Sequence, residues 1–131
     1  MTKRTLLATV AGVVLLGLTG PGAIRAHESA NDLDRLTYVK FNRPVALPGV
    51  ALGAGIYIFE LPDPIGATDV VRVSSQDRRT VYLTAFTRII DRPAGLKANQ
   101  PVSLAEAPAH APQPITAWWP SGDSTGRQFI Y

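Results

Sequence analysis

Residues 69–90, DVVRVSSQDRRTVYLTAFTRII, decide the fold class of this chain. Two runs rich in β-branched and aromatic residues, 69–74 and 80–90, flank a polar stretch at 75–78, and this arrangement predicts an antiparallel hairpin. Successive side chains of a strand point to opposite faces. The alternation therefore predicts one face with Val81, Leu83, Ala85, Thr87 and Ile89, and another with Tyr82, Thr84, Phe86, Arg88 and Ile90.

The same two-residue period extends from this hairpin in both directions. The expected further strands are 36–41, 45–47, 50–52, 56–61, 101–104, 115–119 and 128–131. Glycines and prolines separate them, and the proline-rich stretch 105–114 predicts an extended surface loop. Past the N-terminal segment no helical period of useful length occurs. The pattern predicts an all-β fold, a small antiparallel β-sandwich or open barrel of about eight short strands.

Residues 1–26 have the layout of a secretory signal peptide. Lys3 and Arg4 precede an apolar run at residues 6–18, and Ala26 offers a small residue for cleavage. The run is shorter than the roughly 20 residues of a bilayer span, so membrane contact is expected only through this segment before cleavage. An anchor retained over residues 5–24 is the alternative. We predict an exported, periplasmic or extracellular protein with a flexible arm at 27–35 and a single β domain at 36–131.

The charged residues argue against nucleic acid as a partner. The full chain has 13 basic and 10 acidic residues, a formal net charge of +3. Cleavage of the signal removes Lys3, Arg4 and Arg25 and no acid, which leaves a neutral domain. Nucleic-acid binders retain a basic stripe, and none is visible here. Because the chain has no cysteine, the exported fold must depend on an apolar core rather than on disulfides.

Two motifs mark the first and last parts of the expected domain. Residues 48–59, PGVALGAGIYIF, fit P-G-x-x-L-x-A-G-x-Y-x-F, and residues 119–131, WPSGDSTGRQFIY, fit W-P-x-G-x-x-x-G-x-x-F-x-Y. The chain thereby resembles a family of small uncharacterised secreted bacterial β-domain proteins, in which proline usually stands at the position of Gly53. The resemblance implies the β fold over residues 36–131 and no catalytic residues. Independently of it, Gly122 and Gly126 are expected to take positive φ around a final hairpin.

The sequence shows no catalytic arrangement, so no enzyme activity is predicted. Residues 122–124, GDS, look like part of a serine-hydrolase motif, which needs a histidine base near the serine. The chain has only two histidines to serve as that base, His27 and His110. We therefore interpret residues 122–124 as a polar turn. The nearest candidates for a pair of catalytic carboxylates are interpreted as solvated loop acids: Glu60, Asp63 and Asp69.

The two histidines give one metal hypothesis. Cleavage after Ala26 would make His27 the N-terminal residue, with its α-amine and one imidazole nitrogen available to the same ion. The imidazole of His110 would complete a three-nitrogen site suited to Cu(II). A copper-binding protein is therefore the alternative function. Otherwise no cofactor is expected.

Trp118, Trp119 and Tyr131 are the candidate ligand or partner face. Adjacent residues of a strand face opposite ways, so one indole is expected in the core and the other exposed. An exposed indole beside Tyr131 would suit a glycan or an apolar envelope protein. The alternatives are that loop 105–114 covers the outer ring, or that an exposed edge strand binds the partner instead. We predict a non-catalytic binding or interaction module of the cell envelope; a structural accessory of a larger envelope assembly is a further alternative.

Overall fold

The computed structural model describes residues 36–131, and this part of the chain is all-β. The predicted signal peptide and arm lie outside the described residues. No helix in the described part is long and apolar enough to span a membrane. The strands number nine rather than about eight: β2 (Thr37–Phe41), β3 (Val45–Leu47), β4 (Val50–Leu52), β5 (Gly55–Glu60), β6 (Val70–Ser75), β7 (Val81–Asp91), β8 (Val102–Leu104), β9 (Gln113–Trp118) and β10 (Thr125–Phe129).

These strands form one open hydrogen-bonded sheet. Its order is β2-β5-β6-β7-β10-β9-β3-β4, and β8 pairs with β9 beside this path. All pairs are antiparallel except β3 with β9, which is parallel. The predicted hairpin is β6-β7. Strand β7 belongs to both halves of the sheet, because its first residues pair with β6 and residues 87–91 pair with β10.

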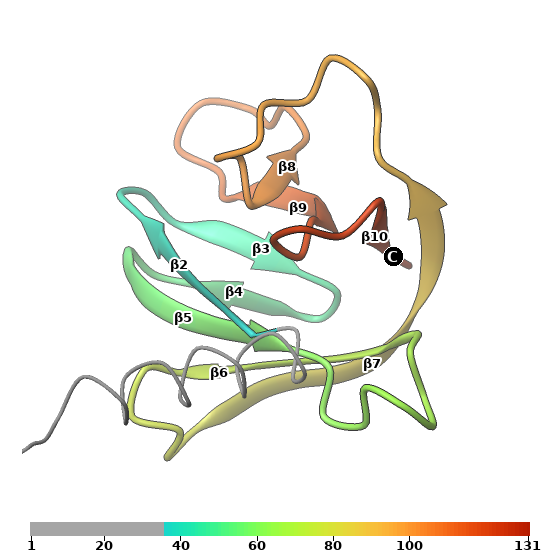
Figure 1. Ribbon diagram of the computed structural model, residues 1–131. Helices are drawn as coiled ribbons and strands as arrows, with labels where there is room; N and C mark the ends of the chain where they lie inside the picture. The colour runs from blue at the N-terminus through green and yellow to red at the C-terminus, as the bar shows by residue number, and fades with distance from the viewer. Residues whose placement is uncertain (1–35) are drawn as a thin grey trace, which may run out of the picture. The chain divides into compact units, whose positions relative to one another are not determined.

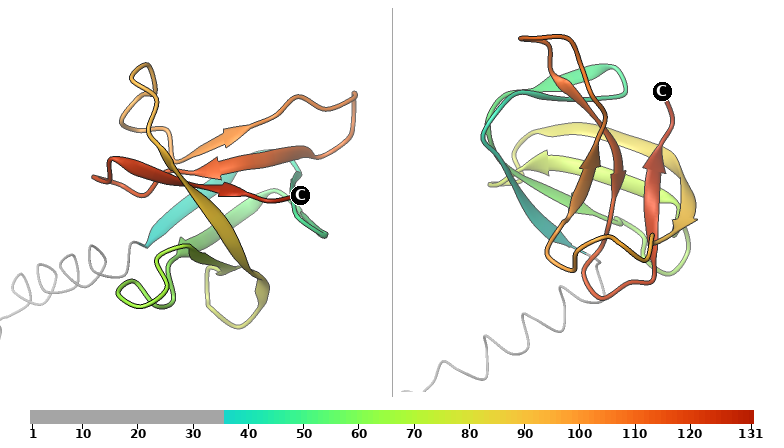
Figure 2. Two further views of the ribbon diagram at one scale, coloured as in Figure 1. Left: turned by 90° about the vertical axis from the view of Figure 1, so that its right-hand side faces the viewer. Right: turned by 90° about the horizontal axis from the view of Figure 1, so that it is seen from above.

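The sheet bends along β7, so that its two halves face each other (Figures 1 and 2). The ring of Phe59 on β5 lies 6.2 Å from Trp118 on β9 and 6.4 Å from Phe129 on β10, between ring centroids. These contacts join the two halves around one apolar core, which is the driving force for the fold in the absence of disulfides. The buried core consists of Val39, Phe41, Val45, Leu47, Leu52, Tyr57, Phe59, Leu61, Val71, Val73, Ile115, Trp118 and Phe129.

A β-bulge breaks the alternation predicted for β7. The register of the β6-β7 pair shifts after Val73, so β7 has one extra residue at this point. Tyr82 consequently packs against Tyr57, with ring centroids 5.5 Å apart, and does not share the face of Phe86, which is 71% exposed. Val81, predicted to share a face with Leu83, is 55% exposed. The predicted alternation fails at this point because the extra residue reverses the side-chain orientation of the β7 residues before it, Val81 and Tyr82.

The last two strands differ most from their predicted bounds. Strand β9 begins at Gln113, which shortens the predicted loop to residues 105–112, and β10 covers Thr125–Phe129 rather than 128–131. Pro114 lies inside β9, where a proline was not expected. It is tolerated because its carbonyl still accepts a hydrogen bond from the Ala105 amide (2.8 Å), while its missing N–H costs only one ladder bond at the end of the strand.

Candidate functional site

Both tryptophans of the predicted ligand face are buried. Trp118 is 0% exposed and belongs to the core, and Trp119 is 4% exposed. The indole Nε1 of Trp118 has no hydrogen-bond partner among the described residues. The expectation that one indole stands free on the surface is therefore wrong.

Trp119 has close partners on β8, on β10 and at Arg92. Its Nε1 donates a hydrogen bond to Ser103 Oγ on β8 (2.8 Å), and the guanidinium carbon of Arg92 lies 5.9 Å from its ring centroid. On β10, a Cβ added to Gly126 would overlap the indole ring. Gly126 is thus needed for space and not for positive φ, whereas Gly122 has the expected φ of +76°.

Tyr131 holds two strands together although its residue is exposed. Its hydroxyl lies 2.7 Å from the Ile115 carbonyl oxygen and 3.0 Å from that of Ala46, and it donates its single proton to this pair. Desolvation of the hydroxyl raises the pKa of Tyr131. Because these carbonyls belong to β9 and β3, Tyr131 connects the parallel pair of the sheet. Trp118, Trp119 and Tyr131 therefore do not form a shared exposed face.

The structure describes one of the two predicted copper ligands. His110 is exposed in the loop between β8 and β9, with a φ of +67°. His27 lies outside the described residues, so the copper site stays a prediction. Within residues 36–131, no three His, Cys, Asp or Glu side chains gather as a metal site.

Glu60 is not the solvated loop acid that the sequence suggested. It ends β5 and is 4% exposed, with one carboxylate oxygen 3.2 Å from both Arg72 Nε and Arg78 Nη1. Arg78 reaches it from the β6-β7 turn in a left-handed backbone conformation, with a φ of +63°. Two cations compensate one buried carboxylate, which is the arrangement expected of an internal ion pair rather than of a proton-transfer site.

The feature that the sequence did not locate is a groove along strand β2. Among the described residues, β2 pairs only with β5, so its other edge is open. Three hollows follow one another along this edge. The first, of about 240 Å³, lies at Thr37 and Tyr38; the second, of about 280 Å³, lies at residues 39–43; the third, of about 530 Å³, lies at Arg43 and Pro44.

The three hollows are adjacent, because neighbouring ones share lining residues. Pro101 lines the first and the second, and both Arg43 and Gln113 line the second and the third. The wall opposite β2 is formed by residues 98–104, which include β8, and by residues 109–113. We call this path the β2 groove. Trp119 contributes to it as a lining residue of the first hollow.

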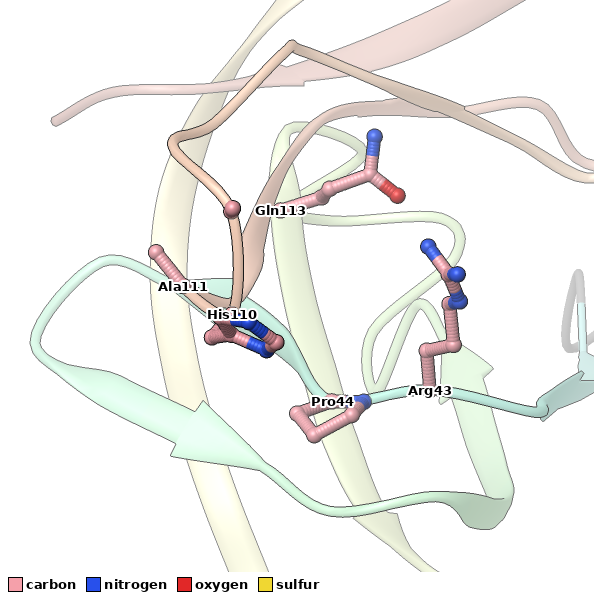
Figure 3. A pocket seen from close by; sticks show the side chains of 6 residues that line it. Arg43, Pro44, His110, Ala111 and Gln113 are labelled. Atoms are coloured by element: carbon pink, nitrogen blue, oxygen red, sulfur yellow. The ribbon is translucent and has the colours of Figure 1, made fainter.

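The β2 groove is apolar in the middle and basic at one end. Val102 and Leu104 from β8 line the second hollow opposite β2. Lys40 and Arg43 line it from the β2 side, and His110 lines the third hollow. Figure 3 shows the side chains of Arg43 and Gln113 extending into the third hollow, with the His110 ring beside Pro44. Among the described residues, no aspartate or glutamate lines any of the three hollows.

The sequence predicted one wall of the β2 groove and not the other. Residues 36–41 were predicted as a strand, and an exposed edge was named as a binding route without a choice of strand. The opposite wall comes from residues about 60 positions later, so only the folded chain brings the two sides together. No family model, curated protein or solved structure matches the chain. The family resemblance of residues 48–59 and 119–131 therefore stays a prediction.

Proposed function

We propose that the protein is a non-catalytic binding module of the cell envelope and that it binds its partner through the β2 groove. The observation that carries this proposal is the coincidence of an open strand edge with a row of adjacent hollows along it and at its end. An edge strand presents backbone donors and acceptors ready for pairing, and a concave apolar lining adds contact area. The two facing halves of the sheet support the assignment to a β-sandwich, and the N-terminal sequence supports export.

The interaction face of the proposal replaces the one expected at Trp118, Trp119 and Tyr131. These side chains make internal contacts, and only Trp119 borders the β2 groove. Trp119 therefore shapes the wall of the groove, and Trp118 packs in the core. The partner remains an envelope component, as the predicted export implies.

Site-specific photocrosslinking in the exporting cell tests the proposal. A photoreactive phenylalanine derivative at Leu104, which lines the second hollow and is 41% exposed, should form a discrete adduct with an envelope component identified by mass spectrometry. The same group at Ile65, which is 91% exposed and outside the groove, is the matched control. Equal adducts at both positions, or none at Leu104, would refute a binding role for the groove.

A further inference from the structure

We propose that the β2 groove takes an extended peptide strand, which pairs with β2 and places an acidic side chain beside Arg43 and His110. This inference rests on the proposed function and adds the chemical class of the partner.

The length of the groove fits an extended chain. The hollows follow residues 37–44 in order; β2 itself covers Thr37–Phe41, about 17 Å of strand, and the chain bends at residues 42–43 before the third hollow. A compact ligand would fill one hollow and leave the others empty. A strand paired with β2 runs along the first two hollows, because it has the same rise per residue as the edge that it follows, and the peptide residues beyond this pairing extend to the third hollow.

The open edge of β2 selects a peptide over a glycan. In an antiparallel pair, alternate residues direct their N–H and C=O groups to the partner strand, and the residues between them direct theirs away from it. On β2 the second set has no strand partner among the described residues. A peptide backbone repeats donors and acceptors at the same spacing as β2, whereas a sugar chain does not. Addition of a strand to a free edge is an established mode of peptide recognition.

The middle of the groove favours alternating apolar side chains on the peptide. Every second side chain of an added strand points to the same face, so one set faces the second hollow. There it meets Val102 and Leu104 on the β8 side, above the buried core side chains Val39 and Phe41. Burial of each such apolar side chain contributes to binding in proportion to the area removed from water.

The charge of the third hollow determines which side chain the peptide needs at the end that lies there. Arg43 and His110 line it together with Gln113, and no acid of the described chain does so. Lys40 lines the adjoining hollow. A guanidinium presents paired N–H groups that match a carboxylate. An aspartate or glutamate side chain at this end of the peptide therefore complements the site.

An edge lysine also serves to prevent sheet-to-sheet association, and Lys40 alone would fit that role. Protection does not require an apolar hollow, a second wall or an arginine at one end. The peptide inference thus makes a prediction that edge protection does not, namely a sequence preference in the ligand with an acid at one end.

Selection from a displayed library of random heptapeptides against the purified protein tests this inference. We expect enriched peptides to alternate apolar residues and to carry Asp or Glu near one end. Against Arg43→Glu, which reverses the charge of an exposed residue, the acidic preference should be lost and affinity for the original peptides should fall at least tenfold. Arg88→Glu, also exposed and outside the groove, is the matched control and should leave both unchanged.

Backbone pairing is tested on one enriched peptide with N-methyl groups on alternate residues. Methylation of the residues that face β2 should weaken binding at least tenfold, because an N-methyl amide cannot donate to the edge. If neither methylated set weakens binding, or if enriched peptides show no acidic preference, the inference is overturned. If no peptide is enriched while Leu104 still forms its discrete adduct, the inference fails and the proposed function stands.

Discussion

Replacement of Trp119 by alanine is the sharpest test of the described fold, because one of the two indoles was expected to be exposed and both are buried. The side chain is 4% exposed, its Nε1 bonds to Ser103 Oγ, and Gly126 has no side chain where the ring lies. Truncation of a buried tryptophan costs about 3–5 kcal/mol. Because a domain of this size is stable by only about 5–15 kcal/mol, Trp119→Ala should lose a large part of its free energy of unfolding.

Urea denaturation followed by circular dichroism measures this loss, with two phenylalanine variants as a matched pair. Trp118→Phe and Trp119→Phe remove similar volume, but only Trp119 donates a hydrogen bond, since Trp118 Nε1 has no partner among the described residues. Trp119→Phe should therefore carry an additional cost of about 1 kcal/mol, which Ser103→Ala should reproduce. A loss below about 1 kcal/mol for Trp119→Ala with an unchanged m-value would show that the ring is solvated.

Three further predictions concern buried polar groups. Glu60→Gln should lower the free energy of unfolding by about 1–3 kcal/mol in urea, because Arg72 and Arg78 keep their charges but are partly exposed. Tyr131→Phe should cost about 1 kcal/mol in the same assay, and no change would mean that its hydroxyl does not connect β3 and β9. Burial, with a smaller contribution from Tyr82, raises the pKa of Tyr57, so its stabilising effect is complete below about pH 10 and is lost as the pH rises through the folded-state pKa. Stability measured from pH 8 to 12 should therefore fall less steeply in Tyr57→Phe; an unchanged slope would contradict this.

Local patterns predicted the strands well because turns and two-residue alternation are properties of short segments. The bounds of β3 and β4 agree with the sequence prediction, since residues 48–49 form a proline–glycine turn between them and Gly49 has a φ of +77°. Tyr82 shows the limit of such reasoning. Its position depends on a register shift in the β6-β7 pair, and nothing in the alternation of β7 alone reveals an extra residue.

The errors at Trp119 and Glu60 have a different cause. The alternation predicts that the side chains of Trp118 and Trp119 point to opposite faces of the sheet. A side chain on the outer face is exposed, however, only if no neighbouring strand covers it. Gly126 and Ser103 cover it from neighbouring strands. Glu60 is buried because two arginines reach it from later in the chain. Both outcomes depend on contacts between distant segments, which a local pattern cannot specify.

The two ends of the sheet deal with the problem of an open edge in different ways. Strand β4, at one end, has only three residues, and a short edge strand offers little backbone for association. Strand β2, at the other end, has five residues, and β8 faces it across the β2 groove. A second sheet that approached β2 edge to edge would meet this opposite wall, whereas a single strand enters along the hollows. The same recess that limits unspecific association therefore leaves the edge open to an extended peptide.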